Sequence, residues 1–144
     1  MSRAFITKIV HAKLTLSPFS AEQMADIGNV VLNDIQDRIK QAKDVTDSPA
    51  KPLVERYARR KILRGRAPVR DLTWRGVTMA SLKVKRASED MVTLGPVNPQ
   101  ADQIITANNR RSKQWGMSPK NFATLRAVLV ASLKARRFTW TKAA

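Results

Sequence analysis

Few residues in this chain have the types and spacing that catalysis or metal binding requires. His11 is the single histidine and has no carboxylate near it in sequence, so a serine–histidine–aspartate arrangement or a multi-histidine metal site has almost nothing to build on. The absence of cysteine excludes thiolate nucleophiles, thiolate zinc sites and a disulfide framework. Glu89 and Asp90 supply half of a carboxylate or metal site, but a hairpin turn uses the same residues, and we favour the turn. Gly65 to Pro68 lacks the glycine spacing and the Lys-Ser/Thr ending of a phosphate loop. We therefore expect no catalytic, cofactor or metal site.

Basic residues with aromatic neighbours are the main candidates for a binding site. The fifteen positions from 56 to 70 hold seven basic residues, namely Arg56, Arg59, Arg60, Lys61, Arg64, Arg66 and Arg70. On a helix, the spacing of three and four places the first four arginines on one face, and a guanidinium binds carboxylate or phosphate in a bidentate manner. Further candidates for contact with a protein partner or DNA are Trp74, Arg110, Arg111, Trp115 and Trp140. Tryptophan and arginine serve nucleic acids and protein interfaces equally well, and burial of each tryptophan in the core remains the alternative.

The net charge is concentrated in the later part of the chain. The 27 Lys and Arg residues outnumber the 11 Asp and Glu residues, which gives a net charge of +16. Residues 1–54 contribute +1 and residues 55–144 contribute +15. A field of this strength attracts polyanions or acidic protein faces, whereas the alternative is a solvated face that only keeps the protein soluble. No zinc knuckle, RNP motif or KH glycine loop accompanies the charge.

The elements that must position these residues begin with a long helix. Ser20 to Gln23 match a capping box. An apolar stripe at helical spacing follows it, made of Met24, Ile27, Val31, Ile35 and Ile39. Residues 44–52 have linker composition, and a short helix is expected over residues 53–63.

The second half of the chain predicts a hairpin between helices. Residues 82–86 and 92–94 alternate apolar and polar side chains, and turn residues lie between them. A short helical segment is expected over residues 101–110. Ser118 and Pro119 are typical of a helix start, and the apolar stripe that follows predicts a helix as far as Arg136 or Arg137: Phe122, Leu125, Leu129 and Leu133.

Together the elements predict a single α+β domain over residues 1–144. In it, the long N-terminal helix and the C-terminal helix pack on a small antiparallel sheet with a β-hairpin. Residues 1–16 are expected to form an arm or an edge strand, and residues 138–144 a short tail. The N-terminus lacks the apolar run of a signal peptide, and no stretch approaches the roughly 20 apolar residues of a membrane helix. We therefore expect a soluble protein that folds in a cytoplasm and has no membrane partner.

The order of several short motifs points to a known family. The segment 53–61 (Leu-Val-Glu-Arg-Tyr-Ala-Arg-Arg-Lys) leads into the segment 71–82, and a hairpin ending at Leu94-Gly95 precedes Trp115-Gly116-Met117-Ser118 and the last helix. Over residues 20–135 this order resembles the tail-completion and neck proteins of tailed bacteriophages, also called the virion morphogenesis family. The chain departs from the family at residues 104–109, where a His-Gln-x-Gly segment is usual, and at residues 111–115, where a Pro-Arg-Pro-Phe run is usual.

The resemblance implies a structural virion protein of the head–tail joint and not an enzyme. Its subunits would form a homo-oligomeric ring, a hexamer or dodecamer, around the DNA channel between connector and tail proteins. The protein would be found in the neck of the virion, and in the host cytoplasm during assembly. The basic surplus would meet acidic faces of neighbouring proteins or DNA, and we favour the protein faces because tight phosphate binding would retard DNA passage. Two other classes stay open, namely a general nucleic-acid-binding protein whose affinity falls with salt, and a small enzyme.

Overall fold

Five helices and a two-stranded antiparallel sheet make up the described part of the chain. They are, in order, α2 (Ala21–Lys40), α3 (Glu55–Leu63), α4 (Val77–Ala80), β1 (Leu82–Ala87), β2 (Val92–Pro96), α5 (Pro99–Arg111) and α6 (Pro119–Ala143). The structure is a computed structural model that describes residues 19–73 and 76–143, with side chains as far as residue 135. The α+β class expected from the sequence is confirmed. The arm or edge strand expected over residues 1–16 lies outside the described residues.

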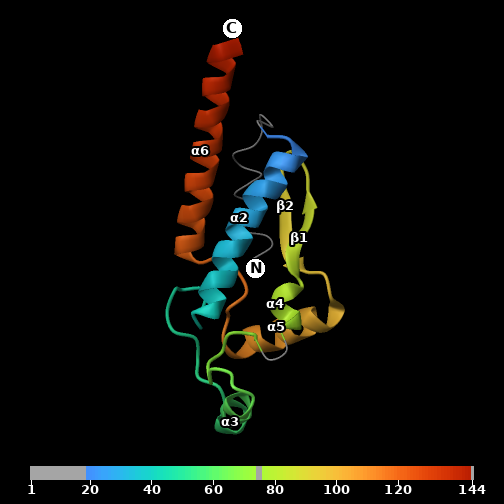
Figure 1. Cartoon of the computed structure of the whole chain (residues 1–144), viewed down its shortest axis with the longest axis vertical. Coiled ribbons are helices and arrows are strands. Elements are labelled where there is room, and N and C mark those ends of the chain that lie inside the picture. The colour runs from blue at the N-terminus through green and yellow to red at the C-terminus, as the bar shows by residue number, and fades with distance from the viewer. Residues whose placement is uncertain (1–18, 74–75, 144) are drawn as a thin grey trace.

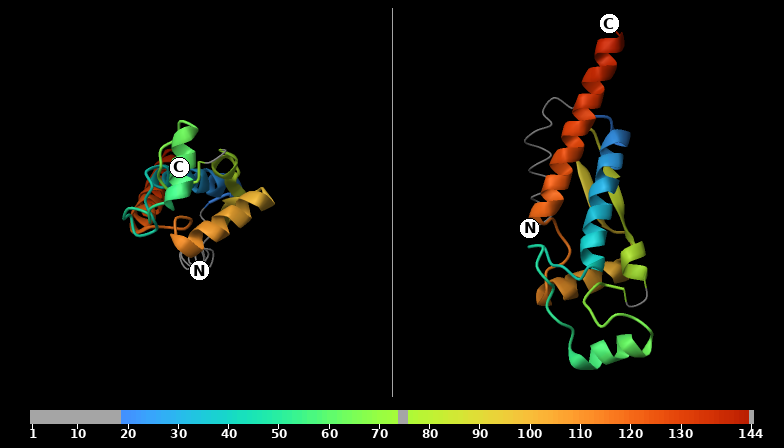
Figure 2. Two further views of the ribbon diagram at one scale, coloured as in Figure 1. Left: turned by 90° about the horizontal axis from the view of Figure 1, so that it is seen from below. Right: turned by 60° about the vertical axis from the view of Figure 1, so that its left-hand side comes forward.

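Helix α2 lies at the centre of the molecule, between α6 on one side and the β1–β2 hairpin on the other (Figure 1). Helices α4 and α5 lie at the open end of the hairpin, and α3 forms one tip of the long axis, while α6 runs to the opposite tip (Figures 1 and 2). The long helix therefore covers the sheet directly, and the C-terminal helix joins the core through its contacts with α2.

The start and the apolar face of α2 follow directly from its sequence. The Ser20 hydroxyl accepts a hydrogen bond from the Gln23 backbone N–H at 3.2 Å, and the Gln23 side chain accepts one from the Ser20 N–H at 2.9 Å. This capping box satisfies two backbone donors that a helix start otherwise leaves unpaired. All five residues of the predicted stripe, from Met24 to Ile39, are buried in the core. The predicted capping box and stripe are both confirmed.

The β1–β2 hairpin packs closely against α2 at Gly28. Leu82 pairs with Pro96 and Ala87 with Val92, and the backbone N–H of Ser88 donates to the carbonyl of Met91 at 2.8 Å to close the turn. Residues 89 and 90 therefore form the hairpin turn, as predicted. A Cβ added at Gly28 of α2 would lie 2.7 Å from Cγ1 of Val92, so glycine allows the helix to lie this close to the strand.

Helix α6 begins as predicted and is longer than predicted. The Ser118 hydroxyl accepts from the backbone N–H of Asn121 at 3.2 Å, and the Asn121 side chain accepts from the Ser118 N–H at 3.0 Å. Leu125 is buried in the core, whereas Leu133 is 40% exposed. The helix extends past the expected end at Arg136 or Arg137 and takes up residues 138–143, because no glycine or proline after Pro119 interrupts it.

The two short helices also differ from expectation at their ends. Helix α3 begins at Glu55, two residues later than expected, because Val54 keeps an extended backbone. Helix α5 begins at Pro99, where the Asn98 side chain accepts a hydrogen bond from the Gln100 N–H at 2.8 Å. None of the helices in the described ranges has the length and apolar character needed to cross a bilayer.

Candidate functional site

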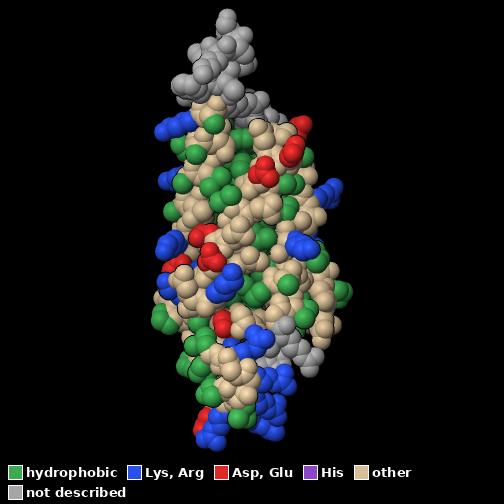
Figure 3. All heavy atoms as spheres, viewed as in Figure 1, with side chains coloured by type: hydrophobic (Ala, Val, Ile, Leu, Met, Phe, Trp, Pro, Cys, Tyr) green, Lys and Arg blue, Asp and Glu red, His purple; other side chains and the backbone are tan. Residues whose placement is uncertain are grey.

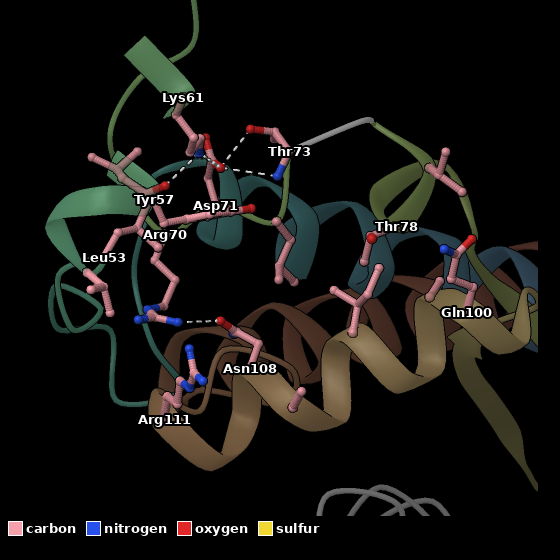
Figure 4. A pocket seen from close by; sticks show the side chains of 17 residues that line it. Leu53, Tyr57, Lys61, Arg70, Asp71, Thr73, Thr78, Gln100, Asn108 and Arg111 are labelled. Carbon is pink, nitrogen blue, oxygen red and sulfur yellow. Dashed lines mark hydrogen bonds and ion pairs between the residues drawn. The ribbon is translucent and has the colours of Figure 1, made fainter. Parts of the chain in front are cut away.

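A buried ion pair anchors α3 at the tip of the molecule. Lys61 is the only residue of this helix that is buried, at 2% exposure. Its Nζ lies 2.6 Å from Oδ1 of Asp71 and donates to the carbonyl of Val69 at 2.7 Å (Figure 4). Asp71 also accepts hydrogen bonds from the backbone N–H and the hydroxyl of Thr73, at 3.1 and 2.6 Å. Burial acts to raise the pKa of Asp71, but the hydrogen bonds from Lys61 and Thr73 outweigh it and hold that pKa below its usual range.

The same anchor turns the arginines of this segment outward. Five arginines of the predicted run are exposed, namely Arg56, Arg59, Arg60, Arg64 and Arg66. Lys and Arg side chains gather at the tip formed by α3 in the space-filling view (Figure 3). Arg59 makes an ion pair with Glu55 one turn earlier, but the two side chains are 75% and 78% exposed, so solvent screens the interaction. We call these five residues the arginine tip.

Arg70 does not belong to the arginine tip, although the sequence grouped it with the run. It is 9% exposed, and its guanidinium donates to the carbonyls of Lys51 and Pro52 at 2.9 and 3.1 Å and to the Asn108 side chain at 2.8 Å. These bonds tie the linker before α3 to the end of α5. Arg70 and its neighbour Asp71 are both buried, so the exposed part of the run ends at Arg66.

A cleft of about 570 Å³ lies between α3, the segment 69–73 and helices α4 and α5. Among the described residues, eight aliphatic side chains, the ring of Tyr57 and eight polar or charged side chains line it. Five of the apolar residues that line it are themselves well exposed: Val54 at 64%, Tyr57 at 38%, Val69 at 38%, Val77 at 45% and Ile104 at 44%. Figure 4 shows the polar side chains that interrupt this lining, with Lys61 and Asp71 on one wall and Asn108 and Arg111 on the other.

Two guanidinium groups, those of Arg70 and Arg111, lie close together at one end of the cleft (Figure 4). Burial, followed by the positive charge of Arg111, lowers the pKa of Arg70. Burial and the nearby carboxylate of Asp71 raise the pKa of the Tyr57 hydroxyl, which Arg70 partly opposes. Within the described residues, the Arg111 side chain has no hydrogen-bond or ion-pair partner, so this end of the cleft carries positive charge that no carboxylate balances.

The remaining predicted site residues are dispersed. Arg110 is exposed beside Arg111 on α5. Trp115 is half-buried and packs against the core. The residue Trp74 and the side chain of Trp140 lie outside the described parts of the structure.

The sequence did not predict the polar residues that hold the loop before α6. Gln114 is fully buried and donates from its side chain to the carbonyl of Arg70. The Asn109 side chain accepts from the backbone N–H groups of Gln114 and Trp115, at 3.1 and 3.0 Å. The guanidinium of Arg38 on α2 donates to the carbonyls of Gln114 and Gly116, at 2.8 and 2.7 Å. The pair of asparagines at the end of α5 is the only sequence signal for this network, since asparagine often satisfies backbone groups next to a helix end.

Comparisons of the chain with protein families, with curated proteins and with solved structures find no match. In residues 19–73 and 76–143, no three His, Cys, Asp or Glu side chains lie together as a metal site would require. The features that stand out in the described structure are therefore the arginine tip and the cleft behind it.

Proposed function

We propose that this protein is a structural neck or tail-completion component of a tailed bacteriophage, which assembles as a ring at the head–tail joint around the DNA channel. The observation that carries the proposal is how the arginine tip is presented. A buried ion pair fixes α3 at one end of the molecule, while its arginines all face solvent.

The arginine tip is suited to a protein partner with an acidic face. Five like charges within eleven residues repel one another, and carboxylates of a neighbouring chain relieve that repulsion. Because the helix is already fixed by Lys61 and Asp71, less conformational freedom is lost when the arginines bind. An adjoining apolar cleft is also more useful in a protein contact than in a contact with phosphates.

The order of motifs supports the same proposal. Two of the segments that resemble the phage family build this end of the molecule, because residues 53–61 include most of α3 and residues 71–82 carry Asp71 and α4. In this role the protein is a virion component that is present in the host cytoplasm during assembly.

A general nucleic-acid-binding protein is the second candidate. The exposed arginines favour it, since guanidinium groups bind phosphates as readily as carboxylates. In that case affinity depends on phosphate contacts and falls steeply as salt rises.

The experiment that separates the two compares matched charge reversals. The first variant is Arg59→Glu, Arg60→Glu and Arg64→Glu at the tip. The control is Lys120→Glu, Arg126→Glu and Lys134→Glu on α6, which changes the net charge equally at exposed positions. Size-exclusion chromatography with light scattering measures the mass of each protein over a concentration series, with and without a duplex DNA oligonucleotide.

We expect the wild type and the α6 control to form oligomers without DNA, and the tip variant to remain a folded monomer by circular dichroism. A wild-type protein that stays monomeric at every concentration and shifts only with DNA would overturn the proposal in favour of nucleic-acid binding. Unchanged oligomers in the tip variant would show that the arginine tip is a solvated face.

A further inference from the structure

The cleft behind the arginine tip has the size and lining of a recognition site for side chains. Its volume of about 570 Å³ falls within the roughly 300–1,000 Å³ of typical ligand pockets. Surface apolar residues are ordinary when they are scattered. Here several line one concavity, since Val54, Val77 and Ile104 are each more than two-fifths exposed and all face the cleft.

The lining excludes some occupants by its chemistry. Bases of single-stranded nucleic acid bind by stacking on aromatic rings, whereas Tyr57 is the one aromatic residue among those that the structure describes around the cleft. The exposed aliphatic residues of the lining instead suit an aliphatic side chain, and the polar residues beside them suit a backbone, so the lining favours a protein segment.

The charge at the end of the cleft determines which protein segment fits. The guanidinium of Arg70 donates hydrogen bonds to three uncharged oxygens. The side chain of Arg111 beside it has no hydrogen-bond or ion-pair partner within the described structure. The arginine tip adds further positive charge nearby, and the whole chain carries +16. A basic segment is repelled there, whereas a carboxylate is attracted and can bind a guanidinium in a bidentate manner.

We propose that this cleft binds an acidic segment of a different protein, with an aliphatic side chain of that segment between α3 and α5 and a neighbouring carboxylate on Arg111. Arg70 supports the same carboxylate through its charge, while it holds α5 through Asn108. The inference rests on the proposed function, because an assembly component must recognise a neighbouring protein. It specifies that the bound segment of this neighbour carries an aliphatic side chain next to a carboxylate.

Three synthetic pentapeptides with blocked ends test the proposal on the full chain. The first, Leu-Asp-Leu-Glu-Leu, carries both features. In the second, Leu-Asn-Leu-Gln-Leu, amides replace the carboxylates, and in the third, Ser-Asp-Ser-Glu-Ser, serine replaces leucine. Two-dimensional NMR spectra of the ¹⁵N-labelled protein record which backbone amides shift and at what peptide concentration the shifts saturate.

We expect the first peptide to give saturable shifts in residues 53–57 and 101–111. The other two peptides should bind at least roughly tenfold more weakly, which corresponds to a loss of about 1.4 kcal/mol of binding free energy. Arg111→Gln should weaken the first peptide to a similar extent. This variant is expected to fold normally, because the Arg111 side chain is exposed and has no hydrogen-bond or ion-pair partner in the part of the chain that the structure describes. Arg126→Gln removes an exposed charge from α6, which contributes no residue to the cleft, and should leave binding unchanged.

Several results would overturn the proposal. If the serine peptide bound as tightly as the first peptide, charge alone would account for binding. If the amide peptide bound as tightly as the first peptide, Arg111 would not recognise a carboxylate. Absence of shifts in the cleft at millimolar peptide, or displacement of the peptide by a single-stranded oligonucleotide that binds the same residues, would also contradict it. The light-scattering test is independent, so a failed cleft and a failed ring are distinguishable.

Discussion

Replacing Asp71 with alanine tests whether the buried ion pair anchors the tip as the structure indicates. The substitution removes the one carboxylate that contacts Lys61 among the described residues, and the Lys61 side chain is 2% exposed. The Lys61 ammonium group then keeps one hydrogen bond, to the carbonyl of Val69. The exposure of the Asp71 side chain is 11%, so neither group can turn to solvent without moving α3.

The magnitude follows from that geometry. Removing one partner of a buried ion pair costs about 3–5 kcal/mol of unfolding free energy, because the other charge stays buried and uncompensated. We expect about 3 kcal/mol for Asp71→Ala, since the bond to Val69 remains. Lys61→Met should cost less, about 1–2 kcal/mol, because Asp71 retains two hydrogen bonds from Thr73.

The double variant separates a buried charge from a packing defect. Lys61→Met combined with Asp71→Ala leaves no charge in this position, so it should be more stable than Asp71→Ala alone, with a coupling of about 2 kcal/mol. Urea denaturation followed by circular dichroism measures all four proteins. Glu55→Gln is the control, because the exposed pair with Arg59 should contribute less than about 1 kcal/mol.

A loss below about 1 kcal/mol for Asp71→Ala would refute the reasoning. It would mean that Lys61 reaches solvent when its partner is absent, and that α3 is held by other contacts. A double variant less stable than either single variant would show that side-chain volume matters more than charge.

Three further perturbations follow from the packing and the electrostatics. Gly28→Ala should cost about 1–2 kcal/mol in thermal unfolding, because the added methyl group would lie 2.7 Å from Val92, and overpacking of about 1–3 kcal/mol exceeds the gain in helix propensity of about 1 kcal/mol. The pKa of Asp71 is lower in the folded state than in the unfolded chain, where it is about 3.9. The ion pair therefore contributes its full stability when the pH is above the unfolded-state pKa, and this contribution is lost as the pH falls through the folded-state pKa. Urea midpoints measured toward acid pH should therefore fall less steeply in Asp71→Ala than in the wild type. Leu125→Ala should cost about 2–5 kcal/mol and Leu133→Ala less than about 1 kcal/mol, because the first side chain is 6% exposed and the second 40%.

Local spacing allowed the helices to be predicted, whereas contacts between distant residues could not be. The capping box at Ser20 involves residues three apart, so the sequence alone indicated it. Helical spacing places Lys61 on the side of Tyr57, away from the arginines, but its burial depends on a carboxylate ten residues later, Asp71, which the sequence did not indicate. Arg70 was grouped with its exposed neighbours for the same reason, since two of its acceptors are backbone carbonyls about 18 residues earlier. Which charges form the tip was thus settled only by the fold.

The position of α6 determines how far apart contacts at the two tips of the molecule would lie. The helix has 25 residues, and at 1.5 Å per residue it is about 37 Å long. It ends at the tip opposite to α3 (Figure 1). Sites separated by much more than about 10 Å usually contribute independently to free energy. A partner at α3 therefore leaves the far end of α6 unobstructed, and affinities at the two tips can change separately, so a substitution that weakens one contact need not disturb the other.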